Sequence, residues 1–182
     1  VGVACPDPSC LETFKELFDH VIEEIHGPVD RKGYVQDWDG SQLCGFEDID
    51  FSYIIRTRMV GARNVSSYAM TPAISKDDRR SLALMMRKCL QHLKGPLAGT
   101  YRHLLEISEE ECELLQSQGL LYPTPPSETS VVVSSGAARN WPEGRGMFVN
   151  ETQDFAVWVN EEDHLRVISL EEGGNISAVF ER

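Results

Sequence analysis

The most informative stretch of this chain reads Trp158-Val159-Asn160-Glu161-Glu162-Asp163-His164-Leu165-Arg166-Val167-Ile168-Ser169. Apolar residues at its two ends predict strands over 154–160 and 165–170, and the acids between them predict a turn. Adjacent carboxylates repel one another, which favours a raised pKa and a role as a general base for one of them. The same acids are also candidates for holding a hydrated Mg²⁺ ion or a cationic guanidinium group, although most acidic turns are simply solvated.

The rest of the chain extends this pattern into a mixed fold. Hydrophobic periodicity and capping residues predict helices over 9–26, 76–94, 108–119 and from Asn175 to Arg182. Further strands are predicted over 51–60, 99–106, 130–135 and 146–149, and a hairpin turn at 150–153 joins the last of these to 154–160. Residues 28–50 read as a connector, and the three prolines within 122–129 predict a loop. The sequence therefore predicts an α+β fold, an antiparallel β-sheet flanked by α-helices.

Arginines form two further groups of candidate binding residues. The chain has neither a G-x-x-x-x-G-K-[ST] nor a G-x-G-x-x-G motif, so phosphate binding would rely on arginine side chains. Arg56 and Arg58 lie on one predicted strand and Arg63 follows it, and the three are either a phosphate clamp or the solvent-facing charges of an edge strand. Arg139 and Arg145 flank Trp141, and they either bind phosphate or stack on that ring.

Composition excludes several classes of function. The 182 residues carry 17 Lys plus Arg against 29 Asp plus Glu, a net charge of −12 that argues against a nucleic-acid binder. The apolar runs are too short to span a membrane, and we expect no secretory leader. The chain has five cysteines, an odd number, and no Cys-x-x-Cys pair. This argues against a structural metal and favours a reducing compartment. We expect a cytoplasmic protein, with a mitochondrial location left open.

The quoted stretch, followed by Glu172-Gly173-Gly174-Asn175 and Val179-Phe180-Glu181-Arg182, resembles the signature of the phosphagen (ATP:guanidino) kinases. Four further blocks resemble the same family, and the last two resemble creatine kinases in particular: 17–27, 53–63, 97–101 and 138–142. The resemblance implies that residues 1–50 are an interdomain helix and connector, and that residues 51–182 are the first part of a catalytic domain. It also implies reversible phosphoryl transfer between MgATP and a guanidino compound of the creatine or arginine class, with ATP/ADP and Mg²⁺ as cofactors and a homodimer as one possible assembly.

The resemblance also assigns roles to individual residues. Glu162 matches the carboxylate that holds the substrate guanidinium and takes its proton, while Glu161 and Asp163 match acids near the magnesium shell. Arg58 and Arg166 match arginines of the phosphate cage. No residue of the chain matches a direct metal ligand.

Several positions depart from the family pattern. Val60 stands in place of a second phosphate-binding arginine, Val149 in place of a histidine near the nucleotide, and Arg56 in place of a small residue. The block 117–122 also differs. Family members are about twice as long, so we expect this chain alone to be inactive. The alternative from another class of function is a degenerate kinase-like module kept for interaction or scaffolding, without catalysis.

Overall fold

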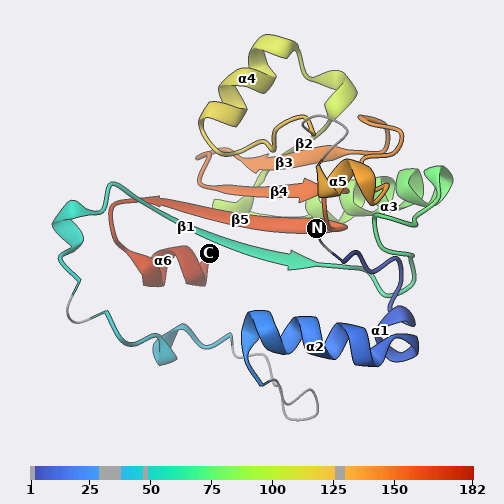
Figure 1. Cartoon of the computed structure of the whole chain (residues 1–182). Coiled ribbons are helices and arrows are strands. Elements are labelled where there is room, and N and C mark those ends of the chain that lie inside the picture. The colour runs from blue at the N-terminus through green and yellow to red at the C-terminus, as the bar shows by residue number, and fades with distance from the viewer. Residues whose placement is uncertain (1–2, 29–37, 47–48, 126–129) are drawn as a thin grey trace.

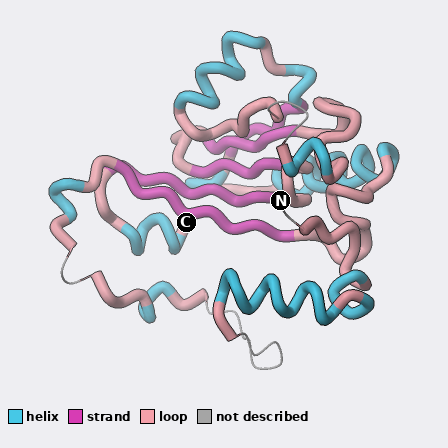
Figure 2. Tube along the Cα trace, viewed as in Figure 1, coloured by secondary structure: helices cyan, strands magenta, loops and turns pink. Residues whose placement is uncertain are grey.

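The computed structural model describes residues 3–28, 38–46, 49–125 and 130–182. Five strands form one antiparallel sheet in the order β1-β5-β4-β3-β2 (Figure 1). Their bounds are β1 (Arg56–Arg63), β2 (Gly99–His103), β3 (Gly146–Asn150), β4 (Phe155–Val159) and β5 (Leu165–Glu172). Figure 2 shows the strands side by side, with helices and loops around them. The predicted α+β fold with an antiparallel sheet is confirmed.

The strand register determines which side chains share a face of the sheet. Trp158 on β4 lies opposite Arg166 on β5, and Arg58 on β1 lies opposite Leu170 on β5. Because side chains alternate along a strand, these four residues all lie on one face. We call it the arginine face, and the other the α3 face.

Each face is covered by its own apolar cluster. On the arginine face, α4 (Glu109–Ser117) and the segment after it pack on the sheet through Leu115, Leu120, Leu121 and Tyr122. The strand residues beneath them are Met147, Ala156, Trp158, Ile168 and Leu170. On the α3 face, α3 (Lys76–Leu90) packs through Ala83, Met86 and Leu90 on Tyr101, Phe148, Phe155, Val157 and Val159. The strands β3, β4 and β5 are therefore enclosed on both sides.

The helices begin where polar side chains satisfy their first amide groups. The Ser75 hydroxyl accepts from the Asp78 amide at the start of α3, and the Ser108 hydroxyl accepts from the Glu111 amide at the start of α4. Asn175 caps α6 (Ile176–Glu181) in the same way, through the Ala178 amide. All three helices were predicted, and each is shorter than its predicted range. Cys89, which lies on the apolar stripe of the helix predicted over 76–94 and was therefore expected to be buried, is exposed.

The strand predicted over 130–135 is wrong. Val131–Ser134 instead forms a short helix, α5. The three consecutive valines favoured a strand, but the Ser130 side chain caps the segment by accepting from the Val133 amide. Gly136, at φ +86°, then ends the turn, so local capping outweighs the β-propensity of the valines.

The strand predicted over 51–60 is displaced. Phe51–Tyr53 forms a 3₁₀ turn capped by Asp50, and β1 begins only at Arg56. Tyr53 and Ile55, whose side chains favoured a strand, are each 84% exposed. The strand predicted over 99–106 likewise ends at His103, where the 3₁₀ turn Leu104–Glu106 follows.

The helix predicted over 9–26 is divided in two. Phe14 departs from helical geometry at φ −110° and ψ 36°, which separates α1 (Cys10–Thr13) from α2 (Lys15–His26). In Figure 1, α2 lies below β1 in the view, beyond that edge of the sheet. Of its predicted apolar face only Phe18 is buried within α2, whereas Leu17 and Ile25 are 51% and 69% exposed. Much of the predicted connector, residues 29–37 and 47–48, lies outside the described residues, as does 126–129 of the predicted loop.

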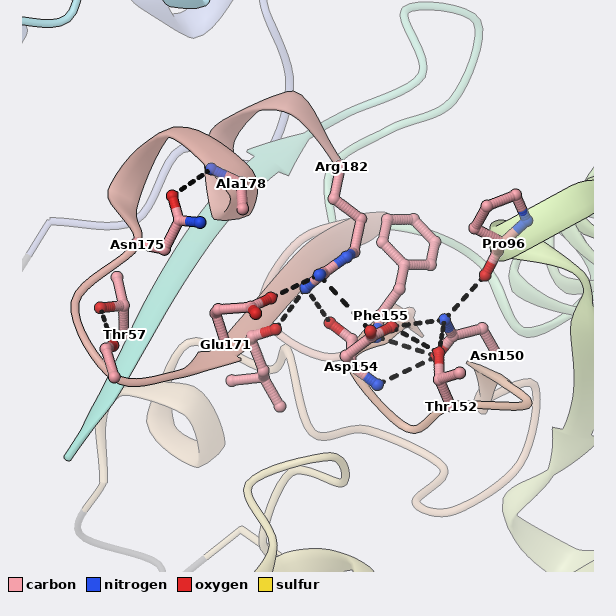
Figure 3. A network of polar contacts seen from close by, with 12 residues as sticks. Thr57, Pro96, Asn150, Thr152, Asp154, Phe155, Glu171, Asn175, Ala178 and Arg182 are labelled. Carbon is pink, nitrogen blue, oxygen red and sulfur yellow. Dashed lines mark hydrogen bonds and ion pairs between the residues drawn. The ribbon is translucent and has the colours of Figure 1, made fainter.

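A polar network closes the end of the sheet where β3 turns into β4 (Figure 3). The buried Asn150 amide group donates to the Pro96 carbonyl and to the Asp154 carboxylate, and its oxygen accepts from the Phe155 amide at 2.9 Å. Arg182, at the end of α6, donates to Glu171 at 2.5 Å and lies 3.4 Å from Asp154. This confirms the predicted hairpin turn at 150–153 and shows how α6 is fastened to it.

No helix within the described residues is both long enough and apolar enough to cross a membrane.

Candidate active site

The three consecutive acids of the turn between β4 and β5 converge on one arginine. The Arg166 guanidinium lies 3.2 Å from Glu161, 2.6 Å from Glu162 and 3.5 Å from Asp163. Burial alone would lower the pKa of Arg166, but its hydrogen bond to Glu162 and the charges of the three carboxylates outweigh burial and raise it. The interpretation of this segment as a merely solvated acidic turn is therefore wrong.

The three acids differ in their exposure. The side chain of Glu162 is 48% exposed, against 16% for Glu161 and 28% for Asp163. Burial raises the pKa of Glu161 above its ordinary value, against the opposing effect of Arg166. A raised carboxyl pKa was predicted from repulsion within the cluster, whereas its largest cause is the burial of Glu161. Glu162 is the acid most open to a ligand.

A second arginine lies on the other strand that borders β5. The Arg58 guanidinium carbon is 5.6 Å from the ring centre of Trp158, and that of Arg166 is 5.8 Å from the same ring. Arg58 is exposed and makes no hydrogen bond or ion pair with any residue that the structure describes. Partial burial, followed by the charges of Arg166 and Arg56, lowers its pKa. Within the described part of the chain, Arg58 is thus a cation without a bound acceptor, which suits it to binding an anion.

Trp158 links the two arginines to the layer above the sheet. Its indole nitrogen donates to the Leu120 carbonyl at 2.6 Å, and its ring makes an edge contact with Tyr122, with centroids 5.1 Å apart. Arg56, two residues before Arg58 on the same face, donates to the Gln118 carbonyl at 2.9 Å. The segment 118–122 is therefore pinned over the arginine face by two side chains from the sheet.

The segment that follows β1 holds the acidic turn in place. The Asn64 amide group donates to Asp163 at 2.9 Å and accepts from the His164 backbone amide at 3.0 Å. His164 is fully buried, and its Nδ1 accepts from the Val65 amide at 2.9 Å. The proton of the neutral ring must then be on Nε2, which donates to the Ala69 carbonyl at 2.9 Å. Burial lowers the pKa of His164, in agreement with a neutral ring.

The remaining sequence candidates are not part of this cluster. Arg63 lies on the α3 face, over the ring of Trp38 at 5.2 Å. Arg145 is fully buried, lies 4.8 Å from the Trp141 ring centre and donates to two backbone carbonyls. Of the two roles predicted for it, stacking on Trp141 is confirmed. Arg139 also donates to backbone carbonyls, those of Gly136, Pro72 and Ile74.

Two positions of the arginine face are apolar. Val60 is the next residue after Arg58 on this face and is 44% exposed, opposite Ile168. Val149 is half-buried and lies opposite Ala156, beside the core under α4. The structure thus places Arg58 and Arg166 over Trp158 and the three acids against Arg166, with no charge at either valine.

Two contributors to this arrangement were missed at the level of sequence: Trp158 and Asn64. The position of Trp158 was in principle accessible, because two strands joined by a short turn place residues 158 and 166 opposite each other. No local signal marks Asn64, which is 99 residues from Asp163 in the chain.

Comparison with known proteins places this arrangement in a family. Residues 81–182 match the family model described as ATP:guanido phosphotransferase, C-terminal catalytic domain. The chain is 39% identical over its whole length to the creatine kinase testis isozyme of Oncorhynchus mykiss and 38% identical to creatine kinase M-type of Homo sapiens. It covers 47% and 48% of those two proteins, so the chain spans about half the length of the curated relatives it matches.

Solved structures agree with this result. A crystal structure of lombricine kinase superposes on 100% of the chain with a TM-score of 0.88 and 35% identity, over 50% of its own length. The duplicated taurocyamine kinase from Schistosoma mansoni, with bound transition state analog components, superposes on 97% of the chain with a TM-score of 0.84 and 35% identity, over 25% of its length. The chain belongs to the ATP:guanido phosphotransferase family and represents a segment of its catalytic domain.

Proposed function

We propose that the protein containing this chain transfers a phosphoryl group reversibly between MgATP and a guanidino compound of the creatine or arginine class. The observation that carries the proposal is that a cation and a carboxylate cluster meet beside one indole: Arg58 and Arg166 both lie over Trp158, Arg166 holds the three acids, and Arg58 has no acceptor among the described residues. Phosphoryl transfer needs this combination, because phosphate oxygens require cations and a guanidinium requires a carboxylate.

In this proposal, Arg58 binds phosphate oxygens of the nucleotide. It is exposed and has no acceptor among the described residues, so no ion pair has to break when a phosphate binds. Arg166 lies close enough to share the same anion, and its present partners hold it in place. The two guanidinium groups are fixed against Trp158, which limits the reorganisation needed on binding.

Glu162 is the proposed partner of the substrate guanidinium. Its carboxylate is the most exposed of the three, and it forms an ion pair with Arg166. A substrate guanidinium offers the same forked donors as Arg166, so Glu162 can bind it with the same geometry. Held there, the carboxylate would orient the attacking nitrogen and accept its proton.

Magnesium enters this proposal with the nucleotide. The described residues include no group of three His, Cys, Asp or Glu side chains arranged to hold a metal ion directly. Glu161 and Asp163 are held by Arg166 at 3.2 and 3.5 Å and face the same site, which fits carboxylates that contact waters of a bound ion. When bound, Mg²⁺ would neutralise phosphate charge during transfer.

The test uses the full natural protein that contains these 182 residues. Calorimetry measures binding of MgADP, and a coupled assay measures phosphoryl transfer to creatine, arginine, taurocyamine and lombricine. We expect nucleotide binding and turnover with at least one of the four. Glu162→Gln keeps the size of the side chain and removes its charge, so it should abolish most of the turnover. Full turnover by this variant contradicts the role of Glu162.

A second candidate is a scaffold module without catalysis. It is favoured by Val60 and Val149, which leave the arginine face short of charge on both sides of the cluster, and by the three acids all being engaged by Arg166. Absence of nucleotide binding at millimolar concentration in a folded protein would support this candidate and exclude the kinase.

We further propose that residues 1–50 form an interdomain helix and connector, that the protein is cytoplasmic, and that it assembles as a homodimer. The exposed apolar side chains of α2 support the first of these proposals, because they suit a contact with a further part of the protein.

A further inference from the structure

A buried polar cluster that the proposed reaction does not use lies beside the acidic turn. It consists of Thr71, Arg79 and Asn160, whose exposed fractions are 1%, 1% and 0%. The three come from the segment before α3, from α3 itself and from the end of β4. We call this cluster the hub.

The hub holds the acidic turn at two points. The Thr71 hydroxyl donates a hydrogen bond to the Glu162 carbonyl. The Asn160 amide group donates to the Arg79 carbonyl at 3.0 Å and to the Gly144 carbonyl at 2.7 Å. Asn160 also closes the turn itself, because its backbone amide donates to the His164 carbonyl at 3.0 Å. Both the first residue of the turn and the backbone of Glu162 are thus tied to the interior.

Arg79 connects the hub to two other segments. Its guanidinium donates to the Arg139 carbonyl at 2.9 Å and to the Thr71 carbonyl at 3.5 Å. Burial, and then the charge of Arg139, lowers the pKa of Arg79, and no carboxylate among the described residues forms an ion pair with it. Burying a cation that is bound only by neutral acceptors costs desolvation free energy, which an apolar side chain of similar size would avoid. The hub is therefore better explained by the geometry it imposes than by stability.

The backbone of Asn160 supports the same explanation. Its φ of +60° lies in the left-handed region, which asparagine tolerates better than most residues. This conformation follows directly on the Val159 end of β4 and precedes Glu161. It redirects the chain so that the next three side chains all reach Arg166.

We propose that Thr71, Arg79 and Asn160 are positioning residues that set the orientation of the acidic turn for phosphoryl transfer. The inference rests on the proposed function. None of the three touches Arg58, so their loss should misplace the Glu162 carboxylate while nucleotide phosphates still bind. Misplacing one reacting group lowers kcat with little change in the KM for the nucleotide.

The test is a pair of substitutions at Thr71 in the full natural protein. Thr71→Val is isosteric and removes the hydrogen bond to the Glu162 carbonyl, whereas Thr71→Ser keeps the hydroxyl. We expect Thr71→Val to lower kcat about tenfold or more, with the KM for MgATP changed by less than about twofold. We expect Thr71→Ser to retain most of the wild-type kcat. Hydrogen–deuterium exchange should rise over residues 160–166 in the valine variant only.

A second variant covers a failure of Thr71→Val to fold. Asn160→Gly removes two donated hydrogen bonds and keeps a residue that accepts positive φ. Its matched control is Gln153→Gly, which replaces an exposed residue at φ +58° in the β3–β4 turn. Asn160→Gly should reproduce the loss of kcat and the raised exchange, and Gln153→Gly should change neither.

Two results are kept separate by this design. Wild-type kcat in folded Thr71→Val and Asn160→Gly overturns the positioning role, whatever happens to the exchange. A wild-type protein that shows no phosphoryl transfer refutes the proposed function instead. In that case hydrogen–deuterium exchange alone tests whether the hub holds the turn. Unchanged exchange over residues 160–166 in Thr71→Val and Asn160→Gly would show that the hub does not hold it.

Discussion

Arg58 and Arg166 lie over the same indole ring at nearly equal distances, 5.6 and 5.8 Å, yet their surroundings are opposite. Arg166 is neutralised by three carboxylates, whereas Arg58 has no acceptor among the residues described. Within the described residues, one ring therefore contacts both an arginine that is paired with carboxylates and an arginine that is not. A phosphate would meet its first strong attraction at Arg58.

The first prediction concerns Arg58. Arg58→Ala should weaken MgADP binding by about tenfold to a hundredfold, because a hydrogen bond to a charged group is worth about 1.5–3 kcal/mol. The affinity of Arg58→Lys for MgADP should lie between that of the wild type and that of Arg58→Ala, because an ammonium group keeps the charge but lacks the forked geometry of a guanidinium. Calorimetry at fixed ionic strength measures both.

Arg63→Ala is the matched control for this measurement. Arg63 lies on the same strand but on the α3 face, over Trp38. Its loss changes the net charge by the same amount and should leave the dissociation constant near the wild-type value. Equal weakening by both variants would show that Arg58 acts only through net charge.

The second prediction concerns the pH dependence of stability through His164. Its pKa is lowered by burial from an ordinary value of 6.5, so below pH 6.5 the unfolded chain takes up a proton that the folded ring resists. The free energy of unfolding should therefore hold above pH 6.5 and decline as the pH falls below it, as far as the lowered pKa of the folded state. Chemical denaturation between pH 7.5 and 5 measures this.

Substitution separates His164 from other titrating groups. His164→Gln cannot be protonated, so its stability should fall less steeply over the same pH range, from a lower starting value. His20→Gln, at an exposed position on α2, is the control and should keep the wild-type slope. An identical slope in all three proteins would mean that other groups cause the decline.

Residues near one another in the sequence largely determine what could be predicted of this molecule. The strands β4 and β5 and the acidic turn were predicted because apolar runs flank three consecutive acids, and the structure places all three acids on Arg166. The start of β1 was misplaced because Tyr53 and Ile55 favour a strand although both are exposed. The strand predicted over 130–135 was wrong for a similar reason: the β-propensity of its three valines is outweighed by the helix cap that Ser130 provides.

Contacts between residues far apart in the sequence are the part of the site that could not be predicted. The hydrogen bond from Thr71 to the Glu162 carbonyl spans 91 residues, and that from Asn64 to Asp163 spans 99. No local pattern around Thr71 or Asn64 points to its partner in the acidic turn. The sequence thus points to the acids of the turn but not to the residues that hold the turn in place.

The third prediction concerns the fastening of α6 (Figure 3). Arg182 donates to Glu171 and to the Leu170 carbonyl, and its side chain is only 18% exposed. Arg182→Met keeps the aliphatic stem and leaves those acceptors without their donor, so the free energy of unfolding should fall by about 1–3 kcal/mol. Arg63→Met, which removes an exposed arginine from β1, should cost less than about 0.5 kcal/mol. Urea denaturation compares the two, and equal losses would show that the Arg182 contacts add nothing.

The last prediction adds a charge in place of removing one. Val60 is 44% exposed and lies two residues after Arg58 on the same face, so an arginine there would have room and a shared ligand. Val60→Arg should tighten MgADP binding by about tenfold, the effect of one added charge-assisted contact. Val131→Arg makes the same change at a 53% exposed position on α5 and is the matched control. If Val60→Arg binds no more tightly than Val131→Arg, the nucleotide phosphates do not lie beside Arg58. Tighter binding with unchanged turnover would instead show that Val60 limits affinity without limiting the chemical step.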